Sequence, residues 1–166
     1  DLQLGIYAQR LDADGNKLWS VDVRVDSNSS TASQYDPAVA EDGNGGVVVV
    51  WREKHSGEDE ADIYAQRLDV SGNRLWAADI RVNSDLGAPR PYATAAVAVH
   101  GSGSAVVVWE DDRNGDDDVY AQRLGPVGNR VWPADVHVNS DTAKASQTDP
   151  SIVVDGTGNA IVVWKD

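Results

Sequence analysis

The chain has 166 residues, the size of one domain, and 41% of them are hydrophobic although Phe, Met and Cys are absent. The lack of Cys excludes disulfides and thiol chemistry, and no apolar run approaches the roughly 18 residues that a membrane-spanning helix needs. The net charge of −13 argues against binding to nucleic acid or to an anionic membrane, because an acidic surface repels phosphate groups.

One repeat accounts for most of the sequence. The string Tyr-Ala-Gln-Arg-Leu occurs three times, at Tyr7–Leu11, Tyr64–Leu68 and Tyr120–Leu124. A Trp ends each of three apolar runs, Val47–Trp51, Ala105–Trp109 and Ala160–Trp164. Val and Trp favour strands, and no long segment has helical periodicity, so the sequence predicts an all-β fold with three similar units.

The first expected elements are a strand at 6–12, a hairpin at Gly15-Asn16 and an alternating strand from Trp19 to Asp26. Alternate positions of that second strand carry its apolar side chains, Trp19, Val21, Val23 and Val25. Period-two alternation predicts a strand with one exposed face, which suits an outer edge. Residues 1–28 therefore correspond to the outer half of a unit.

A complete unit is expected at 34–85. It begins with a short strand, Pro37–Ala40, and a Gly-rich turn, where glycine supplies the positive φ of a tight hairpin. The continuously apolar run Val47–Trp51 predicts a strand buried on both faces. The Tyr64–Leu68 strand and another alternating strand complete the unit.

The same order of elements recurs at 90–141, where Pro133 supports an edge position for the last strand. Residues 147–166 repeat only the inner half of a unit, with a short strand at Ser151–Val154 and the apolar run Ala160–Trp164. The chain therefore carries two complete units and two complementary halves of a third.

Units of this kind predict the blades of a β-propeller. Blades are four-stranded antiparallel sheets stacked face to face, so their inner strands are covered on both sides while the outer strand meets solvent. We expect one repeat domain over 1–166 with three blade-equivalents. The alternative is a β-trefoil, which also contains three repeats of four strands, although its units are typically shorter.

The repeat resembles a family of exported bacterial repeat propellers. The resemblance is carried by the segments Asp149-Pro-Ser, Asp155-Gly-Thr-Gly-Asn, Val-Val-Trp164, Asp62-Ile-Tyr-Ala-Gln-Arg-Leu and Gly-Asn-Arg-Leu-Trp76. The middle unit departs from this pattern, with Ala95 in place of Pro and His100 in place of Asp. The hairpin Asp12-Ala-Asp-Gly-Asn-Lys-Leu-Trp19 is also similar to the Asp-box of sialidase-type propellers. These resemblances imply the propeller fold and a secreted or cell-surface location.

Three blades are too few for a ring, because propellers typically contain about four to eight. An open array would also leave unpaired strands at both ends, which favours aggregation. Since 1–28 and 147–166 are complementary halves of one blade, we expect closure into a six-bladed ring. The second set of blades comes either from another copy, giving a homodimer, or from a longer chain.

Ligand binding is expected on the face where the loops after the second and fourth strands meet, because these loops vary in length and carry charge. The candidate ligand-binding residues on that face are Tyr35, Tyr92, Arg52 and Arg113. The six Trp recur at fixed strand positions, so core packing accounts for them better than sugar stacking does.

The densest acidic segment is Glu110-Asp-Asp-Arg-Asn-Gly-Asp-Asp-Asp118. Closely spaced carboxylates on a Gly-containing loop suit calcium, which takes about six to eight oxygen ligands. The candidate metal ligands are Asp111, Asp112, Asp116, Asp117 and Asp118. The spacing does not match an EF-hand loop, and a solvated acidic loop without a metal is the alternative.

No catalytic grouping stands out in the sequence. Arginine recurs at one position of every unit, at Arg10, Arg67 and Arg123, which favours structural pairing with Asp over catalysis. The sequence predicts a non-enzymatic binding or scaffold module that recognises carbohydrate or protein, with calcium as the candidate cofactor. The alternatives are part of a sialidase-like glycan hydrolase and a purely structural repeat module.

Overall fold

The computed structural model describes residues 5–27, 32–55, 61–84, 94–101, 103–140 and 145–166. Within these ranges it contains twelve β-strands and no helix, so none of the described residues forms a helix that could cross a membrane. The all-β class predicted from the sequence is confirmed.

The strands form four antiparallel sheets in chain order, which we number I to IV. Sheet I contains β1 (Tyr7–Ala8) and β2 (Val23–Arg24). Sheet II contains β3 (Ala32–Glu41), β4 (Val47–His55), β5 (Asp62–Leu68) and β6 (Ile80–Arg81). Sheet III contains β7 (Ala95–His100), β8 (Ser104–Asp111), β9 (Asp118–Leu124) and β10 (Val136–His137). Sheet IV contains β11 (Thr148–Val154) and β12 (Ala160–Lys165).

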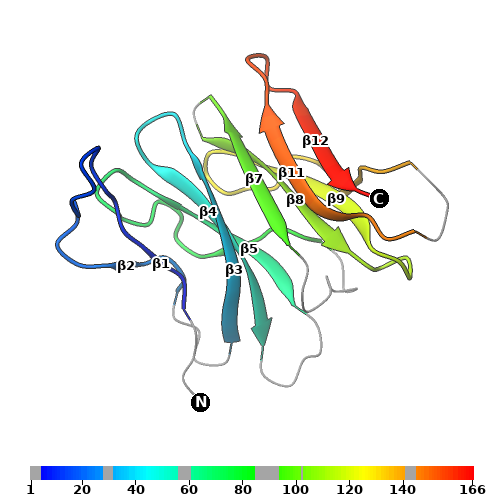
Figure 1. The fold of residues 1–166 in the computed structure, drawn as a ribbon, viewed down its shortest axis with the longest axis horizontal. Helices are drawn as coiled ribbons and strands as arrows, with labels where there is room; N and C mark the ends of the chain where they lie inside the picture. The colour runs from blue at the N-terminus through cyan, green and yellow to red at the C-terminus, as the bar shows by residue number, and fades with distance from the viewer. Residues whose placement is uncertain (1–4, 28–31, 56–60, 85–93, 102, 141–144) are drawn as a thin grey trace.

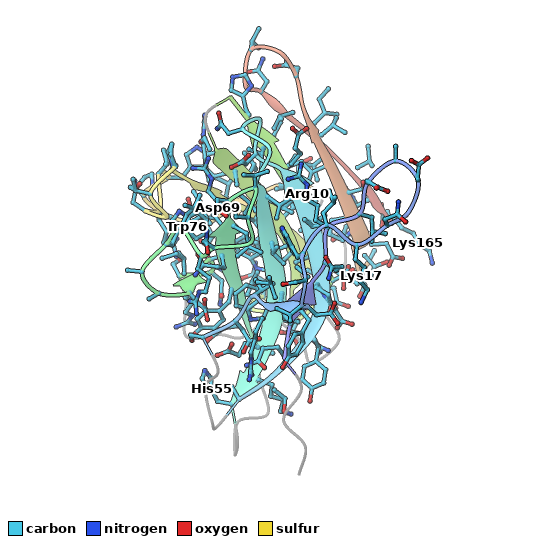
Figure 2. All side chains as sticks on the ribbon, turned by 90° about the vertical axis from the view of Figure 1, so that its left-hand side faces the viewer. Arg10, Lys17, His55, Asp69, Trp76 and Lys165 are labelled. Carbon is cyan, nitrogen blue, oxygen red and sulfur yellow. The ribbon has the colours of Figure 1, made fainter. Side chains whose placement is uncertain are left out.

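The sheets pack face to face in the order I, II, III, IV (Figure 1). Strand β7 lies beside β3 on one side and beside β11 on the other, so the first strands of sheets II, III and IV are neighbours. Figure 1 shows β1 and β2 at one end of this array and β12 at the other. His55, the last residue of β4, lies at the lower end of the stack (Figure 2).

Valine-rich strands supply the centre of the core. The side chains of β4 and β8 from Val48 to Trp51 and from Ala105 to Trp109 are buried, as the unbroken apolar runs predict. Alternate residues of each run pack on opposite neighbouring sheets, because successive side chains of a strand point to opposite faces. These two runs bury large apolar areas on both sides, and we expect them to carry most of the stability.

The predicted fourth strand is wrong in length. Only Val23–Arg24 of the expected Trp19–Asp26 segment is a strand, and the side chain of Val21 is exposed rather than turned inward. In sheet II, a buried glutamine, Gln66, explains why the corresponding fourth strand is short. Its Oε1 accepts hydrogen bonds from the backbone N–H groups of Arg67 and Trp76, both at 3.0 Å. Its Nε2 donates to the Trp76 carbonyl at 3.3 Å, so a side chain replaces the strand ladder here.

The first strand of the complete unit is longer than Pro37–Ala40. Strand β3 spans Ala32–Glu41, and its pairing with β4 shifts register between Tyr35 and Ala38. This bulge lets the strand continue past Pro37, whose nitrogen cannot donate to a ladder.

Candidate binding site

A guanidinium, a phenol ring and a carboxylate meet at the bulge of β3, where Tyr35 lies opposite Arg52 of β4. The Arg52 guanidinium carbon lies 5.1 Å from the centroid of the Tyr35 ring. Arg52 Nη2 also lies 2.7 Å from Asp36 Oδ2. The Arg52 side chain is buried, whereas Asp36 is exposed and Tyr35 is half-buried. The arginine therefore holds an aromatic ring and an acidic group toward solvent in a fixed arrangement.

The backbone at Asp36 has an uncommon conformation that recurs at the equivalent position of sheet IV. Asp36 has φ of 52° and Asp149 has φ of 55°, and each precedes a proline at a register shift of its strand. A non-glycine residue in this region costs about 1–3 kcal/mol, and Asp tolerates it better than most residues. Both strands therefore use an Asp-Pro bulge to direct a carboxylate out of the sheet.

Glu110 connects the corresponding positions of sheets III and IV. Its Oε1 accepts a hydrogen bond from Thr94 Oγ1 at 2.9 Å and another from the backbone N–H of Asp149. Asp36, Thr94 and Asp149 occupy equivalent places in the neighbouring sheets II, III and IV. Thr94 directly precedes β7 and Asp149 is the second residue of β11, whereas Asp36 lies within β3, which begins four residues earlier at Ala32. We call the set Asp36, Arg52, Thr94, Glu110 and Asp149 the polar row.

Sequence reasoning identified Arg52 and Tyr35 but missed the acidic members of the polar row. The available signal was the Asp-Pro pair that begins both Asp36-Pro37 and Asp149-Pro150. It could have been interpreted as a bulge, because proline interrupts a strand ladder. The contact of Glu110 with Asp149 joins two sheets, so local spacing could not have shown it.

Arg113, predicted to bind ligand, is held by protein groups. Its guanidinium forms a salt bridge with Asp111 and another, at 3.2 Å, with Asp135. It also lies 4.0 Å from the centroid of the Tyr120 ring. The arginine thus fastens the loop after β8 onto the sheet, and its aromatic partner is buried.

The carboxylates predicted to bind calcium do not form one group. Among the described residues, no set of three acidic or histidine side chains is arranged to hold a metal ion. Asp111 is buried and accepts a hydrogen bond from the Trp109 indole at 3.0 Å. Asp118 accepts from Asn139 at 2.8 Å and from Asn114 at 3.2 Å. Asp112, Asp116 and Asp117 are half-buried on the connecting loop.

The pKa of Asp118 reflects this environment. Burial raises it, but the hydrogen bonds from Asn139, Asn114 and His137 outweigh burial and hold the pKa below its usual range. The carboxylate therefore stays ionised and linked to the end of the neighbouring strand.

The fourth candidate ligand-binding residue, Tyr92, lies outside the described residues. The same holds for residues 56–60 and 85–91 of the loops expected to contact ligand. In the described part of that face, the polar row and the neighbouring Tyr35 place charged groups beside an aromatic ring that is only half-buried, whereas the ring beside Arg113 is buried.

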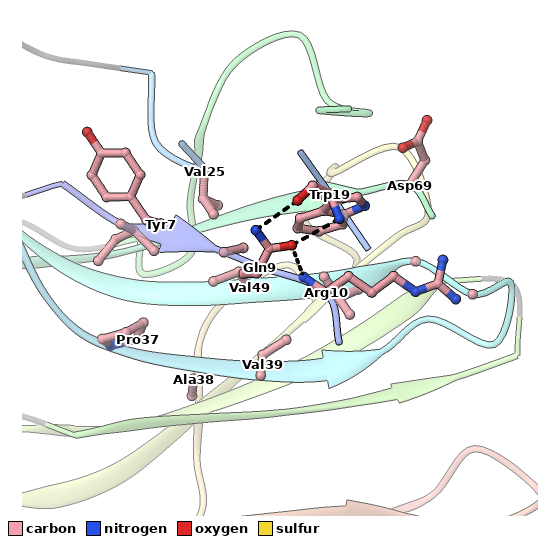
Figure 3. A pocket seen from close by; sticks show the side chains of 15 residues that line it. Tyr7, Gln9, Arg10, Trp19, Val25, Pro37, Ala38, Val39, Val49 and Asp69 are labelled. Atoms are coloured by element: carbon pink, nitrogen blue, oxygen red, sulfur yellow. Dashed lines mark hydrogen bonds between the residues drawn. The ribbon is translucent and has the colours of Figure 1, made fainter. Parts of the chain in front are cut away.

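A hollow of about 460 Å³ lies between sheet I and the neighbouring face of sheet II (Figure 3). Its walls are mainly apolar and include Ala8, Val39 and Val49. Gln9 closes one side by bonding the backbone of Trp19, with its Nε2 3.2 Å from the carbonyl oxygen and its Oε1 3.1 Å from the amide nitrogen. This hollow contains few polar groups that could orient a small ligand.

The chain matches no protein-family model, and a search of curated proteins returns no match. The geometry of the chain itself must therefore carry any assignment of function.

Proposed function

We propose that this chain is a non-enzymatic β-propeller module that binds carbohydrate through the polar row and Tyr35. The observation that supports it most is the placement of equivalent charged and polar groups side by side on three neighbouring first strands, at or near the start of two of them. In a propeller, these strands surround the central axis, and their ends surround the mouth of the channel.

The sheet arrangement supports the propeller. Sheets II and III are four-stranded antiparallel meanders whose first strands are neighbours and whose last strands are short and outermost. Sheets stacked in this way, with equivalent strands in register, are typical of propeller blades. On this proposal sheets I and IV are the outer and inner halves of a further blade.

The chemistry of the polar row suits sugar hydroxyl groups. Carboxylates accept hydrogen bonds from adjacent hydroxyls, and charge-assisted hydrogen bonds are stronger than neutral ones. The Tyr35 ring adds an apolar face on which a sugar ring can pack, with its orientation fixed by Arg52. Because Arg52 and Glu110 are both engaged by protein groups, the row is already ordered before a ligand arrives.

A glycan array with the wild-type chain and a Tyr35→Ala variant tests this proposal. We expect wild-type binding to at least one glycan class and a loss of about tenfold or more in the variant, with an unchanged melting temperature. Val127→Ala, on an exposed hairpin remote from the polar row, is the control and should bind as wild type does.

A panel of fluorogenic glycosides separates binding from hydrolysis. We expect no turnover, since a binding module releases its ligand unchanged. Turnover that Tyr35→Ala abolishes would favour the sialidase-like hydrolase. An array without hits, together with capture of a protein ligand that Tyr35→Ala prevents, would replace carbohydrate by protein as the ligand.

A further inference from the structure

The outer face of sheet IV exposes apolar side chains whose repeat equivalents are buried. Val163 is 59% exposed, whereas Val108 at the same place in sheet III is 0% exposed. Val153 and Ile161 share this exposed face. An exposed apolar face of this kind indicates a surface that another protein segment covers.

Sheet I shows the same difference on its outer face. Leu11 is 58% exposed, but its equivalents Leu68 and Leu124 are 0% exposed. Tyr7 is exposed, whereas Tyr120 at the same position is buried. Both ends of the array therefore present core-type residues to solvent.

The strand edges are complementary as well. Within the described residues, β1 pairs only with β2, and β12 pairs only with β11. Their equivalents in the complete sheets pair with each other, β4 with β5 and β8 with β9. Each end of the array thus lacks the strand that the other end carries.

We infer that β12 of one copy pairs antiparallel with β1 of a second copy, completing one four-stranded sheet at each of two junctions. The register follows from the complete sheets, where Val47 lies opposite Leu68 and Trp51 opposite Tyr64. Sheet III repeats it, with Trp109 opposite Tyr120. The junction therefore places Ala160 opposite Leu11 of the second copy, and Trp164 opposite Tyr7 of the second copy.

This register restores an aromatic contact. Trp51 stacks on Tyr64 with ring centroids 6.4 Å apart, and Trp109 stacks on Tyr120 at 6.5 Å. Trp164 is 38% exposed in the single chain and is their equivalent. Tyr7 of the second copy is the ring on which it would stack.

The junction also supplies a partner for an arginine. Arg67 binds Asp42 through two hydrogen bonds at 2.7 and 2.9 Å within sheet II. Arg10 is the repeat equivalent of Arg67, and Asp155 is the repeat equivalent of Asp42. In the shared sheet these two residues come from different copies. Asp155 of one copy would therefore meet Arg10 of the other.

The hollow between sheets I and II is the space for the arriving strands. Val39 and Pro37 face it and are exposed, whereas Pro150, the equivalent of Pro37, is buried against sheet III. Strands β11 and β12 of the second copy would fill the hollow with Val153, Ile161 and Val163. An apolar hollow lined by strand faces fits such an occupant.

Two copies of the chain are needed to close the ring of blades. This step rests on the proposed propeller, in which each chain supplies two blades and two halves. Propellers typically contain about four to eight blades, so two copies of these 166 residues give an allowed ring, whereas one copy or three copies do not. Head-to-tail contacts that close after two copies also pair the β1 and β12 edges that an open array would leave free.

Light scattering after size exclusion, on the 166-residue chain, tests the inference, and Val163→Asp is the variant. We expect a wild-type dimer and a variant monomer with unchanged circular dichroism, because Val163 is exposed within the single chain. Val127→Asp places the same charge on an exposed hairpin and should remain a dimer. A wild-type monomer, or a dimer unaffected by Val163→Asp, would overturn the inference.

Cysteine pairing tests the register independently. Ala8 and Val163 correspond to Ala65 and Val50, which lie directly opposite each other in sheet II. The double variant Ala8→Cys/Val163→Cys, oxidised with glutathione disulfide, should give a covalent dimer on a non-reducing gel. The shifted pair Ala8→Cys/Val162→Cys should not, because its side chains point to opposite faces. Equal cross-linking of both pairs, or a disulfide within one chain, would contradict the junction.

The two proposals can fail separately. A monomeric wild type that still binds glycans through Tyr35 would overturn the second-copy junction alone. A dimer with the expected cross-link and no ligand on the array would overturn the binding proposal alone.

Discussion

At the scale of single residues, aspartates at fixed repeat positions fasten turns and neighbouring strands. Asp42 is buried, caps the hairpin through hydrogen bonds from the Asn44 and Gly46 N–H groups, and forms a salt bridge with Arg67. Asp69 caps the next hairpin in the same way, through the N–H groups of Ser71 and Asn73, but it is less buried. A comparison of Asp42 with Asp69 therefore separates the contribution of turn capping to stability from the contribution of the buried salt bridge.

We expect Asp42→Asn to cost about 3 kcal/mol of unfolding free energy, because it leaves the largely buried guanidinium of Arg67 without its counter-charge. Asp69→Asn keeps the turn and removes no comparable ion pair, so about 1 kcal/mol or less is expected. Urea denaturation measures both. Equal losses at the two positions would contradict a role for the buried pair.

Among the elements, the short fourth strands follow from a buried amide. Gln66 and Gln122 are both fully buried, and each bonds the backbone of the Trp that starts the segment, Trp76 or Trp132. The side chain takes hydrogen bonds that a partner strand would otherwise take. A purely alternating pattern could therefore end in a two-residue strand.

Gln66→Leu should lower the unfolding free energy by about 2–3 kcal/mol, since it leaves buried backbone groups without partners. The repeat offers an internal comparison, because Gln122→Leu removes the corresponding bonds from the Arg123 and Trp132 N–H groups in sheet III and should have a similar effect. Chemical denaturation of both variants provides the measurement. An unchanged midpoint in either one would show that water or the ladder replaces the glutamine.

For the whole molecule, buried and capping carboxylates tie stability to pH. Burial raises the pKa of Asp135, but hydrogen bonds from the Ser84 N–H and hydroxyl and the charges of Arg130 and Arg113 hold it below the usual range. Asp42 is likewise lowered, since the bonds from Asn44, Arg67 and Gly46 outweigh its burial. A carboxyl whose folded pKa is depressed stabilises the fold above its unfolded pKa, and this contribution is lost as pH falls through the folded value.

We therefore expect the melting temperature to fall steeply as pH drops below about 3.9, the unfolded value of an aspartate. Asp135→Asn should have a shallower dependence below that pH, because one depressed carboxyl is removed. Calorimetric scans between about pH 6 and pH 2 would test both expectations. A slope that Asp135→Asn leaves unchanged would assign the acid sensitivity to other groups.

Several features of the whole molecule follow directly from its local sequence. The repeated Tyr-Ala-Gln-Arg-Leu and Val-Val-Trp strings determined the all-β class, the division into units and the order of strands, because strand periodicity is written in neighbouring residues. The places of Arg52 and Tyr35 beside the variable loops marked them as candidates, and their contact follows from the register of adjacent strands β3 and β4.

Tertiary structure alone decided which partners these polar side chains bind. It assigned Arg113 to Asp111 and Asp135, joined Glu110 to Asp149, and let Gln66 interrupt a strand that alternation had predicted. The physical reason is range: apart from Asp111, the partners lie between 10 and 39 positions away in the sequence, and each side chain binds whichever backbone or charge the stacked sheets bring near it. Burial has the same origin, since Leu11 and Leu68 have identical local sequence and differ only in what covers them.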